Sequence, residues 1–252
     1  MGPEALWALT GIAALLAGAL NAVAGGGSFL TFPALIAAGV PPIAANATSA
    51  MAVSPGYLGS TLGFGPELRQ LPAARLRQEV AIAALGGLLG AGLLLLTPGR
   101  LFAGLVPWLL ALATLLFAIA PWFSRLGTAT QGQASRLARW RLPGLLLVAV
   151  YGGYFNGGLG ILLMALYSLT GENRIHTVNA LKNLNSLVLS LLSVLAFAWA
   201  GAIVWPQALW MMALATLGGW LGARWARRLP ARAVRWGVIA TGSVMSLVFF
   251  LR

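Results

Sequence analysis

The sequence contains neither cysteine nor aspartate, and histidine occurs once, at His176. Without cysteine, the chain cannot form disulfides, thiolate metal sites or a cysteine nucleophile. The four acidic residues are all glutamates, and the spacing supports no Ser–His pairing, so residues for acid–base catalysis are scarce. We therefore expect no catalytic residues, no metal site and no cofactor. An intramembrane enzyme is the weakest of the functions that the sequence leaves open.

Charge is also scarce, since 8% of the chain is charged, whereas 60% is hydrophobic and the mean hydropathy is +0.88. A soluble domain must cover itself with polar groups and does not need this much apolar surface. Several apolar runs reach the roughly 20 residues that cross the hydrocarbon core of a bilayer. They are continuous rather than alternating, which favours helices over a barrel. The sequence predicts an all-α, multi-pass protein of the cell membrane.

The net charge of +12 comes mainly from arginines in short connections between apolar runs, which indicates membrane topology rather than nucleic-acid binding. The connections 65–78, 124–141 and 224–235 carry three, four and five arginines. The corners 97–100 and 201–206 carry one and none. Because basic connections stay in the cytoplasm, we place the first three inside and the last two outside.

Two polar motifs recur along the chain. Gly-x-x-Asn-x-x-x-Gly occurs at Gly18–Gly25 and at Gly153–Gly160, and Asn46-Ala-Thr-Ser49 is echoed by Asn179-Ala-Leu-Lys182. Short apolar segments that glycines interrupt at matching places in two halves indicate the binding site of a secondary transporter. The two halves are therefore interpreted as diverged copies.

Each half combines one broken apolar segment with three continuous ones. Continuous helices are predicted at 43–64, 79–96, 101–123, 175–200, 207–226 and 236–251. Segment 5–38 breaks at Gly25–Ser28 and again near Pro33, and segment 143–170 breaks at Gly157-Gly158 into pieces of about 20 Å.

The predicted topology makes both broken segments re-entrant hairpins, one entered from outside and one from inside. We expect one transmembrane domain, 1–252, with two inverted-topology repeats at about 1–123 and 142–252 and a basic cytoplasmic linker at 124–141. Each repeat holds one broken or re-entrant helix hairpin and three transmembrane helices. The alternative, a single tilted and kinked span in place of each hairpin, stays open.

The glycine breaks are the first candidate binding elements. The start of a half-helix presents N–H groups with partial positive charge, and glycine lets a ligand touch the backbone. The candidates at the breaks and beside them are Asn21, Gly25, Gly26, Gly27, Ser28, Asn156, Gly157 and Gly158. Helix packing alone is the alternative, and it is the role that we assign to Gly86-x-x-x-Gly90 and Gly218-x-x-x-Gly222.

Lys182 is the only lysine and lies inside the helix predicted at 175–200. A lysine in a membrane segment costs on the order of 3 kcal/mol by insertion scales, so it usually faces a cavity or a partner. All four glutamates fall near predicted segment ends, so no carboxylate proton relay of the usual transporter kind is expected. The favoured counter-charge is an anionic substrate. A pairing with Glu172 and snorkelling to the cytoplasmic face are the alternatives.

Polar side chains are expected to surround Lys182. Asn179, Lys182 and Asn183 share one helical face, and Thr48 and Ser49 occupy the corresponding place in the first half. Hydrogen bonds between helices are the alternative role for these residues. His176 is interpreted as a solvated residue at a helix start, with a proton-relay role as the alternative.

At these residues the chain resembles the TauE/SafE sulfite-exporter family. The resemblance rests on Gly18-Ala-Leu-Asn-Ala-Val-Ala-Gly-Gly-Gly27 with Pro33, Ala47-Thr-Ser49, Gly152-Gly-Tyr-Phe-Asn-Gly-Gly-Leu-Gly160 and Asn179-Ala-Leu-Lys-Asn183. It covers nearly the whole chain and implies a carrier for sulfite, thiosulfate, sulfonates or related small anions, built from inverted repeats. Two residues or motifs depart from the family pattern. Thr48-Ser49-Ala50 stands where many relatives look like Thr-Asn-Lys, which leaves one cationic side chain instead of two, and Asn156 stands where many relatives have glycine.

The favoured function is therefore a secondary transporter that moves small sulfur-containing anions across the cell membrane by alternating access. An anion channel on the same scaffold is the alternative. The expected partners are the small anion and the lipid bilayer, with no nucleic acid. A coupling proton or ion, a homodimer, the direction of transport and the identity of the anion are left open.

Overall fold

The computed structural model describes residues 2–23, 26–129, 137–172, 174–225 and 231–251, in which helix is the only regular secondary structure. The elements are α1 (Pro3–Val23), α2 (Ser28–Ala37), α3 (Pro42–Gly63), α4 (Gly65–Arg69), α5 (Ala73–Leu96), α6 (Gly99–Ala129), the 3-10 turn η1 (Ala138–Trp140), α7 (Arg141–Tyr154), α8 (Leu159–Leu169), α9 (Ile175–Trp199), α10 (Trp205–Trp225) and α11 (Ala231–Phe250). Among these residues, four helices, in α1, α5, α6 and α9, are long and apolar enough to cross a membrane. The predicted all-α membrane protein is confirmed.

The predicted continuous helices are present, but three boundaries are displaced by five or six residues. α6 ends at Ala129 instead of residue 123, which shortens the predicted linker 124–141, and α11 begins at Ala231 instead of residue 236. The connection expected at 65–78 contains α4 and the first turn and a half of α5, which begins at Ala73 instead of residue 79. The reason is local, because Pro72 precedes a run of alanine, leucine, arginine, glutamine and glutamate that favours helix. Arg75 also pairs with Glu79 one turn later, at 3.0 Å. Glu79 therefore lies within the helix rather than at its start.

Both predicted glycine breaks interrupt the helices. The segments α7 and α8 have 14 and 11 residues, which at 1.5 Å per residue gives about 21 and 16 Å, close to the expected half-helices. The first hairpin is less even, because α1 has 21 residues and α2 has 10. The break expected near Pro33 was wrong, since α2 continues to Ala37 with Pro33 buried inside it. Proline removes only one helical hydrogen bond there, and the ring packs in the core.

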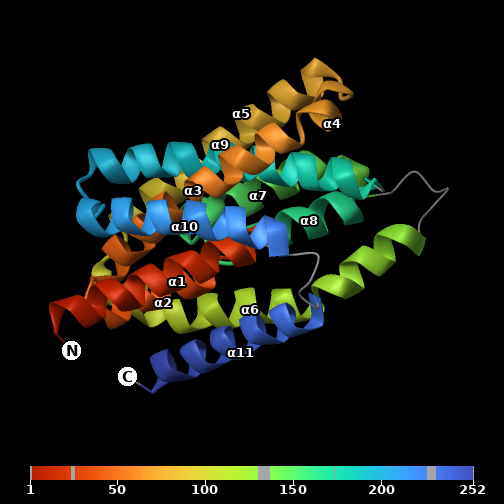
Figure 1. Ribbon diagram of the computed structural model, residues 1–252. Coiled ribbons are helices and arrows are strands. Elements are labelled where there is room, and N and C mark those ends of the chain that lie inside the picture. Colours follow the sequence, from red (N-terminus) through yellow and green to blue (C-terminus); the bar gives the residue numbers. More distant parts are fainter. Residues whose placement is uncertain (1, 24–25, 130–136, 173, 226–230, 252) are drawn as a thin grey trace.

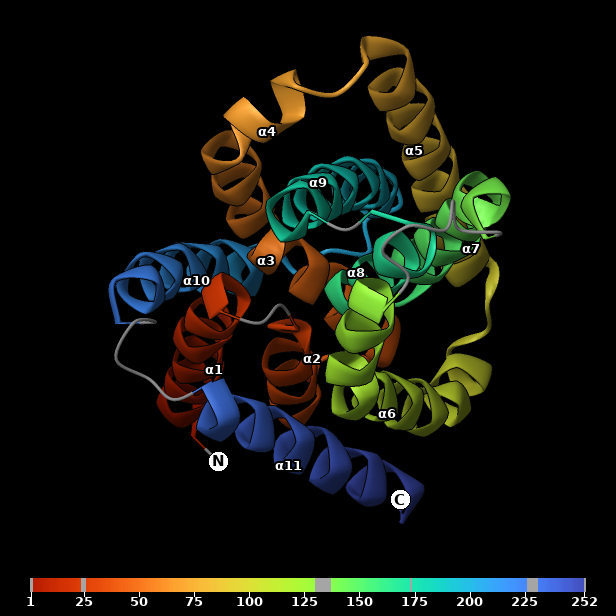
Figure 2. The ribbon, with the colours of Figure 1, turned by 90° about the vertical axis from the view of Figure 1, so that its right-hand side faces the viewer.

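The helix contacts follow a two-fold pattern. α1 packs along α10, α5 packs along α7, and α3 contacts α9 near the middle of the bundle (Figure 2). The pattern relates α1–α3 to α7–α9, and α5 and α6 to α10 and α11. For most pairs of helices in contact, the corresponding pair under this relation is also in contact. Each half thus packs one of its helices, α5 or α10, against the hairpin of the other half.

The two hairpins open at opposite ends of the bundle (Figure 1). The α1–α2 hairpin opens at the end where the N-terminus lies, together with the α5–α6 and α9–α10 connections. The α7–α8 hairpin opens at the other end, where α4 and the α8–α9 connection lie. This grouping agrees with the arginine-based topology, while the inverted repeat and the side that faces the cytoplasm stay predictions. Residues 130–136 and 226–230 of two arginine-rich connections lie outside the described residues.

Glycine seams hold the exchanged helices in close contact. A Cβ atom on Gly90 would overlap the carbonyl oxygen of Val150 in α7, and one on Gly218 would overlap that of Leu15 in α1. A Cβ atom on Gly222 would lie 2.5 Å from the Cα atom of Ala19. The packing role predicted for the Gly86–Gly90 and Gly218–Gly222 motifs is confirmed.

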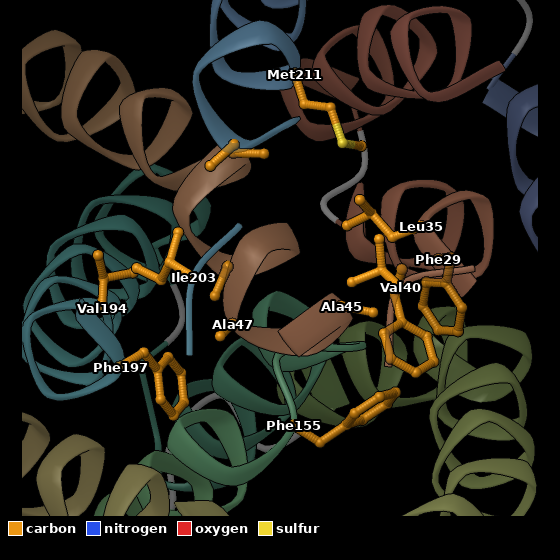
Figure 3. Packing of buried hydrophobic residues seen from close by; sticks show 14 of the residues in the cluster. Phe29, Leu35, Val40, Ala45, Ala47, Phe155, Val194, Phe197, Ile203 and Met211 are labelled. Carbon is orange, nitrogen blue, oxygen red and sulfur yellow. The ribbon is translucent and has the colours of Figure 1, made fainter. Parts of the chain in front are cut away.

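The apolar core brings the two glycine breaks together. Phe29 and Phe32 follow the first break and Phe155 precedes the second, and all three side chains are at most 1% exposed. The rings of Phe32 and Phe155 meet edge to face, with centroids 5.5 Å apart. Figure 3 shows Phe29, Ala45 and Phe155 gathered in this core. Because these aromatic side chains pack on one another, the polar residues next to them lie at the same level of the bundle.

Candidate functional site

A small polar cavity lies where the two glycine breaks meet α3 and α9. Its volume is about 10 Å³, enough for about one water molecule. The lining residues are Asn21, Gly26, Gly56, Tyr57, Ser60, Gly160, Lys182 and Asn183. Gly26 belongs to the first break and Gly160 to the start of α8 after the second, so both breaks reach the same cavity.

Lys182 provides the charge of this cavity. Its side chain is partly buried and faces the cavity from α9, and a Cβ atom placed on Gly160 would lie 3.7 Å from its Cδ atom. Within the described ranges, no carboxylate forms an ion pair with Lys182. The pairing with Glu172 was wrong, because Glu172 accepts a hydrogen bond from Arg75 at 3.1 Å.

Two further polar side chains face the cavity without a partner. Asn183 is 6% exposed, and Ser60 is half-buried at the cavity wall. In the part of the chain that the structure describes, neither side chain forms a hydrogen bond. Tyr57 also lines the cavity, and its hydroxyl donates to Oδ1 of Asn156 at 3.3 Å. The cavity therefore combines one ammonium with hydroxyl and amide donors, and no carboxylate lines it.

The first glycine break is stabilised by a hydrogen bond to the side chain of Asn21. Its Oδ1 atom accepts a hydrogen bond from the Gly27 N–H at 2.7 Å, which closes the turn between α1 and α2. Gly26 adopts φ +102°, a conformation that favours glycine, and it lines the cavity. Gly25 lies outside the described residues.

The second break is shaped by Gly157 and Gly158. The Gly157 carbonyl accepts a hydrogen bond from the Tyr151 hydroxyl at 2.8 Å. Gly158, with φ +76°, occupies the position before α8 and turns the chain into that helix. The N–H groups of Leu159 and Gly160 have no acceptor among the described residues and mark the positive end of α8, beside Lys182.

Several predicted site residues make structural contacts instead of lining the cavity. Thr48 accepts a hydrogen bond from the Val204 N–H at 3.0 Å, and Ser49 shares one with Thr31 at 2.6 Å. Ser28 is buried in the first turn of α2, and Asn179 is partly buried on α9 outside the lining. Asn156 contacts the site only through Tyr57. A direct role in binding for these residues, and for Gly157 and Gly158, stays a prediction.

A second buried polar cluster, which the sequence did not predict, surrounds Glu79. This side chain is fully buried, and its Oε1 atom lies 3.0 Å from Nε of Arg75 and 3.5 Å from Nε of Arg141. Its Oε2 atom accepts a hydrogen bond from the Tyr167 hydroxyl at 2.6 Å. Asn185 donates to that hydroxyl at 2.7 Å, and also to the Leu181 carbonyl at 2.9 Å.

The Glu79 cluster joins α5, α7, α8 and α9 and compensates its own charge. Arg75 bridges Glu79 and Glu172, so two carboxylates meet Arg75 and Arg141. The signal in the sequence was the Arg75-x-x-x-Glu79 pair. It was not recognised as a pair within one helix, because that helix was predicted to begin at residue 79 and Arg75 was placed in the connection before it. In the described ranges, no three His, Cys, Asp or Glu side chains gather to hold a metal ion.

A larger cavity adjoins the polar one between α1, α3 and α10. Its volume is about 460 Å³, and Asn21, Gly56 and Ser60 line both spaces. The rest of its wall is formed by Gly18, Val53, Pro55, Gly59, Ala215, Thr216, Gly219 and Trp220. None of these lining residues is charged, so Lys182 lies just beyond an uncharged vestibule.

Comparison with known proteins places the chain among membrane transporters. Residues 10–249 match the sequence profile of the family described as sulfite exporter TauE/SafE. A probable membrane transporter protein, ORF9, of Sinorhizobium sp is 28% identical over 230 residues, which is 89% of this chain and 84% of the relative. The probable membrane transporter protein YfcA of Escherichia coli K12 is 27% identical over 239 residues, 92% of this chain and 85% of the relative.

A third relative, a probable membrane transporter protein of Haemophilus influenzae Rd, is 33% identical over 212 residues, 81% of this chain and 79% of the relative. No solved structure matches the chain. The matched profile and the relatives describe transporters and not enzymes.

Proposed function

This chain belongs to the sulfite exporter TauE/SafE family of multi-pass membrane transporters, and we propose that it is a secondary carrier for a small sulfur-containing anion such as sulfite, thiosulfate or a sulfonate. The anion is held in the Lys182 cavity, where the two glycine breaks meet. It is exposed alternately to the two sides of the cell membrane as two groups of helices move against each other.

The single observation that carries this proposal is the unpaired Lys182 in a cavity lined by donors. A cation inside a membrane protein requires a counter-charge, and the described residues supply none to this ammonium. The positive end of α8 adds to the same potential. An oxyanion offers the acceptors that Lys182, Asn183 and Ser60 need, so the cavity fits an anion better than a cation or a neutral ligand.

The closed state of the cavity supports a carrier over a channel. A channel needs a continuous aqueous path, whereas the polar cavity holds about one water molecule, less than an oxyanion of several heavy atoms occupies. Substrate therefore enters only after the surrounding helices separate. The larger vestibule adjoins the cavity along α3 and would provide the route of access.

The direct test is a binding screen of purified protein against sulfite, thiosulfate, sulfate, taurine, sulfoacetate and simple carboxylates. Wild type should bind at least one sulfur oxyanion, and Lys182→Met should remove that binding while the protein remains folded and monodisperse in detergent. Equal affinity of wild type and Lys182→Met would refute the site. Saturable flux into proteoliposomes supports a carrier, and an unsaturated electrodiffusive current supports a channel.

The helix contacts support a movement of two groups of helices against each other. The group formed by α1–α3 and α10 meets the group formed by α7–α9 and α5 mainly where α3 contacts α9. At that boundary the hydroxyls of Ser54 and Ser190 lie 2.9 Å apart. Within the first group, the hydroxyls of Thr31 and Ser49 lie 2.6 Å apart. The two hydroxyl pairs share α3, so they form a matched test of movement.

Because the chain has no cysteine, either pair can be replaced by two cysteines and joined with dibromobimane, whose thioether links resist sulfite. Each double variant is compared with its own unlinked form. We expect the link in Ser54→Cys/Ser190→Cys to stop transport and the link in Thr31→Cys/Ser49→Cys to leave the rate of that unlinked variant largely unchanged. Undiminished transport through the linked Ser54→Cys/Ser190→Cys protein would exclude alternating access at this boundary.

A further inference from the structure

We propose that Tyr57 and Ser60 on α3 are anion-binding residues that face Lys182 and Asn183 on α9 across the polar cavity. The substrate is then bound between the two groups of helices rather than by one of them alone. This inference rests on the proposed function and extends it, since it assigns the first half's contribution to a segment that neither the repeat pattern nor the family resemblance indicates.

The first support is the hydrogen bonding of the serine and threonine hydroxyl groups along α3. Thr48 and Ser49 bond to Val204 and Thr31, Ser54 bonds to Ala50 and Ser190, and Thr61 bonds to the carbonyl of Tyr57.

Ser60 differs from the rest. Among the described residues it is the one serine or threonine of α3 whose hydroxyl has no hydrogen-bond partner, and it lines the same cavity as Lys182. A hydroxyl group that has no protein partner at the wall of a polar cavity is available to a ligand.

The second support is the long hydrogen bond of Tyr57. Its hydroxyl donates to Oδ1 of Asn156 at 3.3 Å, beyond the usual range for a hydroxyl donor. Tyr57 lines the cavity, and Asn156 lies within the second glycine break. An anion beside Lys182 is a stronger acceptor than a neutral amide, so the Tyr57 hydroxyl would turn from Asn156 to the anion.

The third support is the place of Asn183. This side chain is 6% exposed, lines the cavity one residue after Lys182, and has no hydrogen bond within the described ranges. Buried amides are nearly always hydrogen-bonded, so its free donor indicates a ligand. Tyr57 and Ser60 from α3, with Lys182 and Asn183 from α9, then provide donors from both sides of the boundary.

The chemistry restricts what binds. All four side chains can donate hydrogen bonds, and no carboxylate lines the cavity, so the occupant is rich in acceptors and negatively charged. A halide accepts without preferred directions, whereas an oxyanion offers several separated oxygen atoms to donors on α3 and α9. We therefore expect the site to select sulfur oxyanions over chloride, and the two hydroxyls to contribute to that selection.

The test measures the affinity of purified full-length protein for sulfite, kept free of oxygen, by titration calorimetry. Tyr57→Phe removes only the hydroxyl, and we expect the dissociation constant to rise about ten- to a hundredfold, as for loss of a hydrogen bond to a charged group. Ser60→Ala should raise it by roughly tenfold. In both variants, selectivity for sulfite over chloride should fall.

The matched control is Thr61→Val, which removes a hydroxyl of the same helix that donates to the carbonyl of Tyr57 and does not line the cavity. It should leave the sulfite affinity within about twofold. Sulfite binding that needs Lys182 but is unchanged by Tyr57→Phe and by Ser60→Ala overturns this inference and leaves the proposed function standing. Wild type that binds no screened anion overturns both.

Discussion

Two buried polar clusters lie within one helical turn of each other on α9, and they differ in whether their charges are paired within the protein. Around Glu79, which Asn185 helps to enclose, two carboxylates meet two arginines that are mostly buried. Around Lys182, a single ammonium faces hydroxyl and amide donors, and no acid lines the cavity. The first cluster balances its own charge without a ligand, and the second does not. The difference supports Lys182 as the binding residue and Glu79 as a structural one.

Removing the Glu79 carboxylate should give the largest effect on folding. Glu79→Ala leaves Arg75 and Arg141 without their common partner, and breaking a buried ion pair by deleting one side typically destabilises by about 3–5 kcal/mol. We expect a large fall in melting temperature in detergent and a low yield of folded protein. Glu4→Ala, at an exposed glutamate near the start of α1, is the control and should change little. Equal stability of the two variants would contradict the structural role.

Removing the Lys182 ammonium should change stability in the opposite direction. Without a bound anion, the buried charge is uncompensated, so Lys182→Met should raise the stability of the empty protein by up to about 3 kcal/mol. The melting temperature without ligand and its increase on adding sulfite provide the measurement. We expect a higher value without ligand and no further increase with sulfite.

Arg75→Met is the matched substitution at the charge-balanced cluster. It makes the same exchange of a cation for an apolar side chain, but it deprives Glu79 and Glu172 of a partner, so stability should fall. If Lys182→Met and Arg75→Met destabilise equally, the distinction between the two clusters is wrong.

The fold and one side of the site could be predicted from the sequence for the same physical reason. Membrane helices are long apolar runs, and glycine breaks and a lone lysine stand out against them, so α7, α8 and Lys182 lie close to where they are expected.

The other side of the site could not be predicted from the repeat. The repeat aligns Thr48 and Ser49 with Leu181 and Lys182 by sequence spacing alone, and spacing does not say which face of α3 meets the cavity. In the structure Ser49 bonds to Thr31 of α2 instead. The cavity is lined by Tyr57 and Ser60, which lie two to three turns further along α3. A helix that is buried on several sides has no clear hydrophobic period, so the pattern does not reveal this face.

The Glu79 cluster could not be predicted for a different reason. Its members come from α5, α7, α8, α9 and the α8–α9 connection, and they are far apart in the sequence. Only the packing of α5 on α7 and α9 brings them together, and glycine seams rather than charge patterns determine that packing.

The smallest expected effect tests whether the Glu79 cluster is held by charge or by hydrogen bonds. Tyr167→Phe removes the hydroxyl that donates to Glu79 at 2.6 Å and leaves both arginines in place. Because the ion pairs remain, we expect a loss of only about 1–2 kcal/mol in the free energy of unfolding. Tyr154→Phe, whose hydroxyl makes a longer bond of 3.3 Å to Thr97, is the control and should cost less. A loss at Tyr167 as large as that of Glu79→Ala would mean that the hydroxyl, and not the arginines, keeps the buried carboxylate in place.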